Sequence, residues 1–217
     1  MSGATVPHRK KHSDANTRRR SIRDRLLVAI EELARAGEPY STVSVERLAT
    51  TAGISRATFY IYFEGKADLL DAWFADVEAE LASAAAVWFA WDGSSTEQEL
   101  GQALQGVADV YLSHGRLLAA FNDEATQNLE LRERLNAAVE RVTEDLRAHI
   151  ETGQRDGWVD PDLLAPELAA WMISMFERGL GNAVAGSGPG EQGRLMADLS
   201  SMFWHVLCVG SSAHQER

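Results

Sequence analysis

The residues best suited to bind a partner lie together at residues 53–66, which read GISRATFYIYFEGK. Arg56 can hold a guanine through two hydrogen bonds, and Tyr60 can touch a thymine methyl group or a phosphate. Lys66 adds an ammonium group at the expected start of a further helix, where unpaired backbone amides also attract phosphate. These residue types at this spacing predict a polyanionic partner.

Two short helices must position these side chains, and the sequence predicts a helix-turn-helix. Ala49 permits the helices to approach closely, Gly53 four residues later suits a left-handed turn, and Ile54 fills the corner. Phe59 and Phe63 stand one helical turn apart and are expected to face the protein body. A helix held in this way leaves its other side free for a major groove.

The free side of the second helix carries Arg56, Ala57 and Tyr60, which we expect to face bases. Thr42 and Ser44 precede the first helix, where a helix start favours contact with the DNA backbone. A plain helical hairpin with solvated arginines and surface tyrosines is the alternative that the pattern leaves open.

The charge of the chain is divided unequally between its two ends. Residues 1–66 carry 12 Lys and Arg against 7 Asp and Glu, a net charge of +5, and the remaining residues carry 9 against 25, a net charge of −16. A basic front and an acidic body indicate that only the front meets a polyanion. Residues 1–16 are polar and basic with no periodic apolar face, so we expect a flexible basic arm there.

The rest of the chain shows helical periodicity without period-two alternation, which predicts an all-α protein. We expect a DNA-binding domain of three helices at residues 17–66 and a larger helical domain of about six helices at residues 67–217. The expected helices cover residues 17–36, 45–52, 56–63, 66–88, 97–111, 116–124, 129–155, 166–185 and 194–209.

Other features exclude several classes of protein. Cys208 is the only cysteine, so an intramolecular disulfide is excluded and the cytoplasm is the expected compartment. The sequence has neither a signal-peptide core nor a segment apolar enough to cross a membrane. The six histidines lack the spacing of a zinc site, and no P-loop, dinucleotide fingerprint or nucleophile elbow occurs. We therefore expect no metal, no cofactor and no enzyme activity.

The segment SVERLATTAGISRATFYIYFEGKADLL closely resembles the DNA-binding segment of the TetR family of bacterial regulators. The residues that match the family pattern are Gly53, Thr58, Phe59, Tyr60, Tyr62, Phe63, Lys66 and Leu69. A narrower likeness, carried by FERGL, the glycine-rich break after it and a tryptophan in the last helix, is to the subgroup of the ethionamide-resistance repressor.

The resemblance implies a regulator, expected to be a repressor, that binds a palindromic operator as a homodimer and is released by a small, largely apolar effector. It also implies that Thr58, Tyr62 and Lys66 hold phosphates. The full set of expected DNA contacts is Thr42, Ser44, Ser55, Arg56, Ala57, Thr58, Tyr60, Tyr62 and Lys66. An all-α ligand carrier or enzyme without specific DNA binding is the rival hypothesis.

The body carries aromatic and methionine side chains that suit either an apolar pocket or a plain core. The resemblance favours the pocket, with effector contacts expected at Leu104, Val107, Tyr111, Phe121, Trp171, Met175, Phe176 and Asn182. A dimer seam is expected on the last two helices. The residues available for it are Ala169, Ala170, Ile173, Gly179, Leu180, Met196, Leu199, Phe203 and Leu207.

Overall fold

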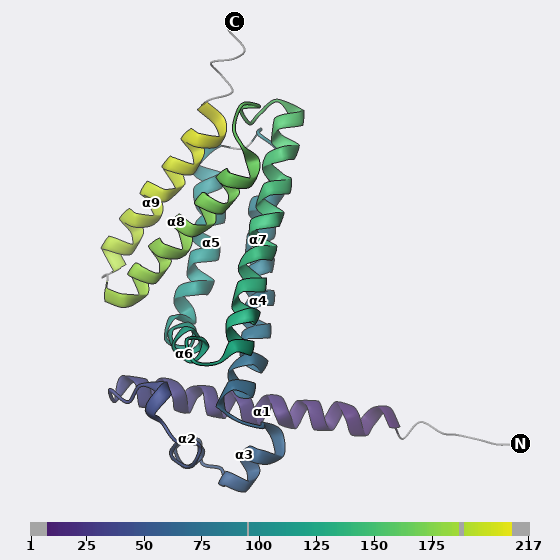
Figure 1. Ribbon diagram of the computed structural model, residues 1–217, viewed down its shortest axis with the longest axis vertical. Helices are drawn as coiled ribbons and strands as arrows, with labels where there is room; N and C mark the ends of the chain where they lie inside the picture. Colours follow the sequence, from purple (N-terminus) through teal and green to yellow (C-terminus); the bar gives the residue numbers. More distant parts are fainter. Residues whose placement is uncertain (1–7, 95, 187–188, 210–217) are drawn as a thin grey trace, which may run out of the picture. The chain divides into compact units, whose positions relative to one another are not determined.

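The computed structural model describes residues 8–94, 96–186 and 189–209, and in these ranges it contains helices and no strands. Figure 1 labels nine α-helices. They are α1 (His8–Arg35), α2 (Val45–Thr51), α3 (Arg56–Tyr62), α4 (Lys66–Phe89), α5 (Glu97–Ser113), α6 (Gly115–Ala125), α7 (Leu129–Asp156), α8 (Ala165–Gly186) and α9 (Pro189–Trp204). A 3₁₀ turn at Tyr40–Thr42 and a π turn at His205–Val209 complete them. The all-α prediction is confirmed.

Two helices begin earlier than expected. α1 starts at His8 instead of residue 17, so the last part of the predicted flexible arm is helical, while residues 1–7 lie outside the described residues. A polar stretch rich in Lys and Arg has good helix propensity but no apolar face to reveal it. α9 starts at Pro189 instead of residue 194, because proline is well suited to the first helical position.

Local signals in the sequence account for several helix ends. The hydroxyl of Thr96 accepts a bond from the backbone N–H of Glu99 at 3.3 Å, and the Glu99 carboxylate accepts from the Thr96 N–H at 2.7 Å. These two bonds form the predicted capping box at the start of α5. α1 is followed by Gly37 at a φ of 81°, a left-handed conformation that suits glycine after a helix.

The chain divides into two compact units. Unit 1 comprises Met1–Ala75 and Arg116–Leu131, and unit 2 comprises Asp76–Gly115 and Arg132–Arg217. The helices α4 and α7 therefore have residues in both units, and so does α6, whose first residue, Gly115, belongs to unit 2. No helix in the described ranges is long and apolar enough to span a lipid bilayer.

The core of unit 1 joins the short helices to α1 and α6. Leu26, Leu48 and Phe59 are fully buried there. Phe74 of α4 stacks on Phe121 of α6 with ring centroids 4.3 Å apart. The α6 segment thus packs on α4 within unit 1, although its start lies 49 residues after the start of α4 in the chain.

The core of unit 2 lies between α5, α8 and α9, which run alongside one another in Figure 1, with the end of α4 packed against them. Leu104, Ala108 and Ala169 are completely buried. Gly179 of α8 lies so close to Leu199 of α9 that an added Cβ would meet a Leu199 methyl carbon at 2.9 Å. Close packing of these helices buries most of their apolar residues within one chain.

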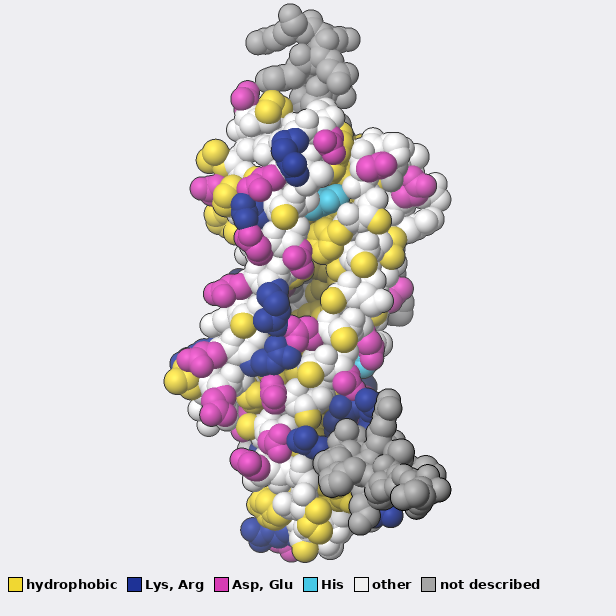
Figure 2. All heavy atoms as spheres, turned by 90° about the vertical axis from the view of Figure 1, so that its right-hand side faces the viewer, with side chains coloured by type: hydrophobic (Ala, Val, Ile, Leu, Met, Phe, Trp, Pro, Cys, Tyr) yellow, Lys and Arg dark blue, Asp and Glu magenta, His cyan; other side chains and the backbone are white. Residues whose placement is uncertain are grey.

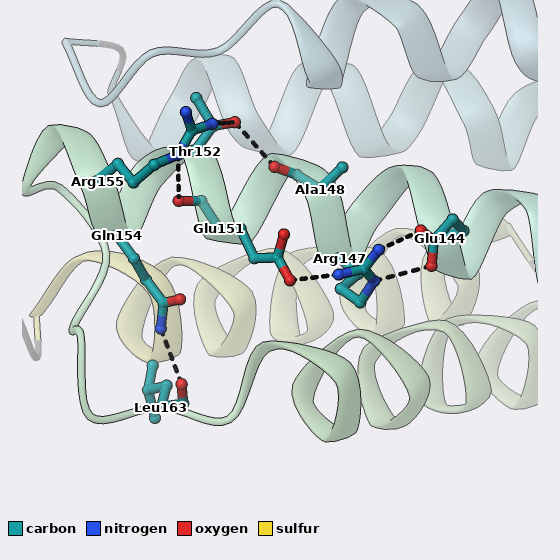
Figure 3. Close-up of polar contacts among 8 residues, drawn as sticks. All are labelled: Glu144, Arg147, Ala148, Glu151, Thr152, Gln154, Arg155 and Leu163. Atoms are coloured by element: carbon teal, nitrogen blue, oxygen red, sulfur yellow. Dashed lines mark hydrogen bonds and ion pairs between the residues drawn. The ribbon is translucent and has the colours of Figure 1, made fainter.

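The exposed side of α7 is held by ion pairs between neighbouring turns. Figure 2 views the molecule from the right-hand side of Figure 1, and acidic and basic side chains are interspersed over that face. In Figure 3 the guanidinium of Arg147 lies between the carboxylates of Glu144 and Glu151. The Gln154 amide donates to the backbone oxygen of Leu163 at 2.8 Å, which ties the α7–α8 connection to the helix. Pairs at this spacing each stabilise a helix by about 0.2–0.5 kcal/mol.

Candidate nucleic-acid interface

The turn between α2 and α3 has the geometry that the sequence predicts. Gly53 adopts a φ of 66°, a conformation that glycine reaches without strain. The Ile54 N–H donates to the Ala49 oxygen at 2.9 Å and closes the turn. Arg25 of α1 donates from Nη2 to the Ala52 and Gly53 oxygens at 2.8 and 2.7 Å. The turn is therefore held by its own backbone and by a charged side chain from α1.

Serine side chains cap both helices of the motif. The Ser44 hydroxyl accepts from the Arg47 N–H at 3.1 Å, and the Ser55 hydroxyl accepts from the Thr58 N–H at 3.0 Å. The hydroxyls of Ser55 and Thr58 are also 2.8 Å apart and share a hydrogen bond. Each cap contributes about 1 kcal/mol to its helix. Both serines remain solvent-exposed, so each is available to DNA as well.

One side of α3 is buried as predicted. Phe59 and Phe63 are 0% and 1% exposed, with ring centroids 5.7 Å apart. The guanidinium carbon of Arg19 lies 5.2 Å from the centre of the Phe63 ring, and Nη2 of Arg19 pairs with Asp68 at 3.1 Å. These contacts fix the rotation of α3 about its axis.

The opposite side of α3 presents an arginine and a tyrosine to solvent. Arg56 and Ala57 are exposed, and Tyr60 is 48% exposed. The guanidinium carbon of Arg56 lies 5.6 Å from the Tyr60 ring centre, a cation–π distance that steadies both side chains. Ile61 is 73% exposed beside them, and the sequence interpretation did not select it. An apolar side chain at this place can contact a thymine methyl group.

Lys66 is bonded to other residues of unit 1. Its Nζ donates to the Tyr40 and Ser41 oxygens at 2.7 and 3.3 Å, and it lies 3.9 Å from the Glu124 carboxylate. The Tyr40 hydroxyl donates to the Lys66 oxygen at 2.9 Å. These bonds hold the ammonium within unit 1, and the phosphate contact of Lys66 stays a prediction.

The other expected phosphate contacts differ in how freely they can reach DNA. Thr42 is exposed, although its hydroxyl donates to the Pro39 oxygen at 2.9 Å. Thr58 and Tyr62 are half-buried, and the hydroxyl of Thr58 already shares a bond with Ser55. The structure thus brings the expected set to one end of unit 1, with Arg56 and Tyr60 the most accessible large side chains among them.

Electrostatics around Tyr40 reflect its depth in unit 1. Burial, and then the negative charge of Glu124, raise the pKa of the Tyr40 phenol well above its usual range. The phenol is therefore a permanent hydrogen-bond donor at neutral pH. On the surface nearby, hydrogen bonding by Arg47 lowers the pKa of the exposed Glu38 carboxyl, and the two side chains are 2.7 Å apart.

Three residues that sequence reasoning did not select support this end of unit 1: Arg25, Tyr40 and Glu124. Each acts on a partner at least 26 residues away in the sequence. Periodicity shows which side of a helix is apolar, but it contains no signal for a polar pair at such a separation.

The residues expected to bind an effector do not form a single group. Leu104, Val107, Tyr111, Met175 and Phe176 belong to the unit 2 core or pack against it. Phe121 lies in unit 1 against Phe74. Trp171 is 68% exposed and Asn182 is also exposed. The aromatic pattern in the sequence therefore grouped residues of the unit 2 core with exposed residues and with a residue of unit 1.

A cluster that we call the aromatic end of unit 2 consists of Trp88, Phe89, Trp91, His149, Trp158 and Trp204. Trp91 and Trp158 meet edge to face at 4.5 Å, and Trp158 lies 5.2 Å from the His149 ring. Burial lowers the pKa of the His149 imidazole. Among the described residues, the buried Nε1 of Trp88, Nε1 of Trp91 and Nε2 of His149 have no hydrogen-bond partner.

Comparisons with known proteins agree with the geometry of unit 1. Residues 26–73 match the family model described as "Bacterial regulatory proteins, tetR family". This match spans the core of α1, the whole helix-turn-helix and the first part of α4. A search of curated protein sequences found no match.

Solved structures of similar fold cover nearly the whole chain. A TetR-family transcription regulator from Marinobacter aquaeolei VT8 is 25% identical with a TM-score of 0.59, over 89% of this chain and 98% of its own. NalD of Pseudomonas aeruginosa, named as the secondary repressor of a multidrug efflux pump, is 18% identical with a TM-score of 0.69, over 87% and 98%. FadR of Bacillus subtilis, in complex with stearoyl-CoA, is 16% identical with a TM-score of 0.68, over 84% and 98%.

Two of these neighbours are named as transcription regulators and the third as a repressor, and each has a fold similar to that of this chain. The match over residues 26–73 lies on the very helices whose turn, caps and exposed arginine form the candidate interface. The segment at residues 26–73 thus matches the model of the TetR family of bacterial regulatory proteins, and the fold of the chain is similar to that of solved TetR-family transcription regulators.

Proposed function

We propose that this regulator is a repressor that binds a palindromic operator as a homodimer and leaves it when a small, largely apolar molecule binds unit 2. The observation that carries the proposal is the exposed face of α3, where Arg56 lies against Tyr60 on a helix that Ser55 caps. Repression is supported by NalD, a neighbour of similar fold that is named as a repressor.

Base reading falls to Arg56 and Tyr60, with Ala57 and Ile61 beside them, while Thr42, Ser44 and Ser55 hold the DNA backbone. Ser44 and Ser55 stand at helix starts, where hydroxyl and backbone N–H groups converge on an anion. Thr58 and Tyr62 complete the backbone contacts. The basic segment at residues 1–16 adds sequence-independent attraction and reaches the adjacent minor groove.

A dimer is required because a palindromic operator mirrors a two-fold axis in its protein. Most of the residues first expected in the seam are buried within one chain, including Ile173, Leu199 and Phe203. The exposed side of the same two helices offers other apolar residues, since Trp171 is 68% and Met202 37% exposed, and Leu164, directly before α8, is 67% exposed. We place the dimer contact there.

Release requires that an occupant of unit 2 favours a state in which the two α3 helices no longer fit successive major grooves. Helix α4 is the physical link, since it starts at Lys66 in unit 1 and ends at Phe89 in unit 2. FadR, whose structure contains stearoyl-CoA, supports an effector with a long apolar part.

The direct test is to select bound fragments from a genomic library with the purified full chain and to measure affinity by fluorescence anisotropy at two salt concentrations. The expected result is tight, salt-sensitive binding to one palindromic sequence by a dimer. Deletion of residues 2–16 should weaken binding and reduce its salt dependence, because fewer phosphates are neutralised.

The rival hypothesis, an all-α carrier or enzyme, would be supported if no fragment bound specifically. The family and the fold neighbours favour the regulator. Arg56→Ala separates the two further, because it should weaken operator binding and relax base selection in a regulator but leave ligand binding by a carrier unaffected.

A further inference from the structure

A groove of about 380 Å³ runs between the end of α4 and the first half of α5 in unit 2. Its lining is mainly apolar and includes Val87, Trp88 and Trp91 on one side and Leu100 and Ala103 on the other. None of the eight expected effector residues lines it. The lining on α5 spans Glu99 to Gly106, about 10 Å at the rise of an α-helix. An elongated apolar molecule fits such a groove better than a compact polar one.

Two of the lining side chains contain polar atoms without partners. Trp88 and Trp91 are 4% and 6% exposed, and in the described part of the chain neither indole N–H has an acceptor. A buried tryptophan N–H is normally hydrogen-bonded, because an unpaired buried donor loses its bond to water without replacement. Two such donors beside one groove point to an occupant that carries hydrogen-bond acceptors.

A glycine in the groove adds an independent observation. Gly106 lies within α5, where glycine lowers helix stability relative to alanine. A Cβ added at Gly106 would meet no atom within 4 Å, so helix packing does not require a glycine there. The absent side chain instead leaves the groove open along α5.

The charge of the lining restricts the ligand further. Glu99 is the only ionisable side chain in the described lining, and its carboxylate already accepts from Thr96 in the capping box. A ligand carboxylate or phosphate would thus meet a negative charge and no cation. An uncharged acceptor, such as a ketone, ester or amide oxygen, is compatible with both the tryptophans and Glu99.

We propose that this groove binds an uncharged, elongated apolar molecule with a carbonyl-type acceptor, which takes hydrogen bonds from the indole N–H groups of Trp88 and Trp91. Both nitrogens lie below the surface, so the rings turn towards the groove as the ligand enters. The claim that this groove is the effector site rests on the proposed function. The claim that the groove binds such a molecule does not depend on DNA binding.

Calorimetric titration of the full chain with three probes of equal chain length tests the ligand class: methyl octyl ketone, decene and decanoate. Saturable binding of the ketone is expected, with decene about threefold to tenfold weaker because it lacks the acceptor. Decanoate should also bind more weakly than the ketone because of its charge. Absence of saturable ketone binding, or equal affinity for all three probes, would overturn the proposal.

Two kinds of variant test the location. Trp88→Phe and Trp91→Phe should each weaken ketone binding about threefold to tenfold more than decene binding, since both ligands lose contact with ring surface but only the ketone also loses an N–H donor. Trp73→Phe, a buried tryptophan of unit 1, is the matched control and should change neither. Equal losses for ketone and decene in the two groove variants would contradict the donor role.

Gly106→Leu fills the groove without removing a packing contact, so it should abolish binding of both ketone and decene while circular dichroism shows a folded helix. Gly181→Leu, at a helical glycine of α8 that also meets nothing within 4 Å, is the control. Unchanged ketone binding in Gly106→Leu would place the site elsewhere. If the ketone binds the wild type but leaves operator affinity unaltered, the proposed binding site is supported, and the proposal that its ligand releases DNA is contradicted.

Discussion

The Tyr40–Lys66 pair of unit 1 and the aromatic end of unit 2 differ in how their buried polar atoms are bonded. In unit 1 the Tyr40 hydroxyl donates a hydrogen bond to the backbone oxygen of Lys66, and the Lys66 ammonium donates to the backbone oxygens of Tyr40 and Ser41. In unit 2 the described residues offer no partner to the buried nitrogens of Trp88, Trp91 and His149. Satisfied polar atoms make a rigid support, as a surface that reads DNA needs, whereas unsatisfied ones favour a site that an incoming molecule can complete.

The largest effect should follow from removal of the buried ring that holds α3. Phe59→Ala deletes a fully buried phenyl group and should destabilise the protein by about 3–5 kcal/mol. Operator binding should be lost with it, since α3 is then no longer held in one orientation. Chemical denaturation followed by circular dichroism measures the change. A loss below about 1 kcal/mol would mean that unit 1 is not the rigid support that its packing indicates.

Removal of the exposed cation should change DNA binding and leave folding unaltered. Arg56→Ala should weaken operator binding by about 1–3 kcal/mol and relax selection at one base position. Arg132→Ala, an exposed arginine of α7, is the matched control. Anisotropy against operator variants gives the result, and equal losses at every base position would reassign Arg56 to a phosphate.

The serine cap of α3 can be tested separately for stability and for DNA contact. Ser55→Ala should cost about 1 kcal/mol of stability, because the Thr58 N–H loses its acceptor. Ser55→Asp retains a capping oxygen, so stability should be preserved, while its negative charge should repel DNA. Thermal denaturation and anisotropy together distinguish the two roles. Undiminished operator affinity in Ser55→Asp would remove this residue from the interface.

A matched pair of aromatic substitutions addresses the difference between the units directly. Tyr40→Phe removes a bonded hydroxyl and should cost about 1 kcal/mol. His149→Phe removes a buried nitrogen that has no partner in the described residues, so it should be neutral or stabilising. Urea denaturation measures both. A similar cost in the two variants would show that the His149 ring has an additional role in the fold.

The smallest expected effect is on the pH dependence of stability. Burial lowers the pKa of folded His149 below its unfolded value, so the unfolded chain binds more protons as the pH falls through that unfolded value. This group therefore reduces stability below about pH 6.5 and is without effect well above it. The fall in the free energy of unfolding between pH 7 and pH 5 should be less steep in His149→Phe. Identical slopes would contradict a buried neutral imidazole.

Sequence alone determined the features that depend on neighbours in the chain. The caps at Ser44, Ser55 and Thr96 act on amides three residues further along, and Gly53 makes its turn between adjacent helices. Most helix bounds were predicted within a few residues for the same reason. The start of α1 was not, because a polar segment has no apolar periodicity to mark it.

Tertiary structure decided which partner each side chain meets. Periodicity identified apolar residues on α8, but only packing showed that Ile173 is buried while Trp171 is exposed. It likewise placed the Lys66 ammonium against Tyr40 and Glu124, which are distant in the sequence. A helical pattern shows how apolar a face is. The packing of the whole chain decides which element covers that face and which buried polar atoms are left without partners.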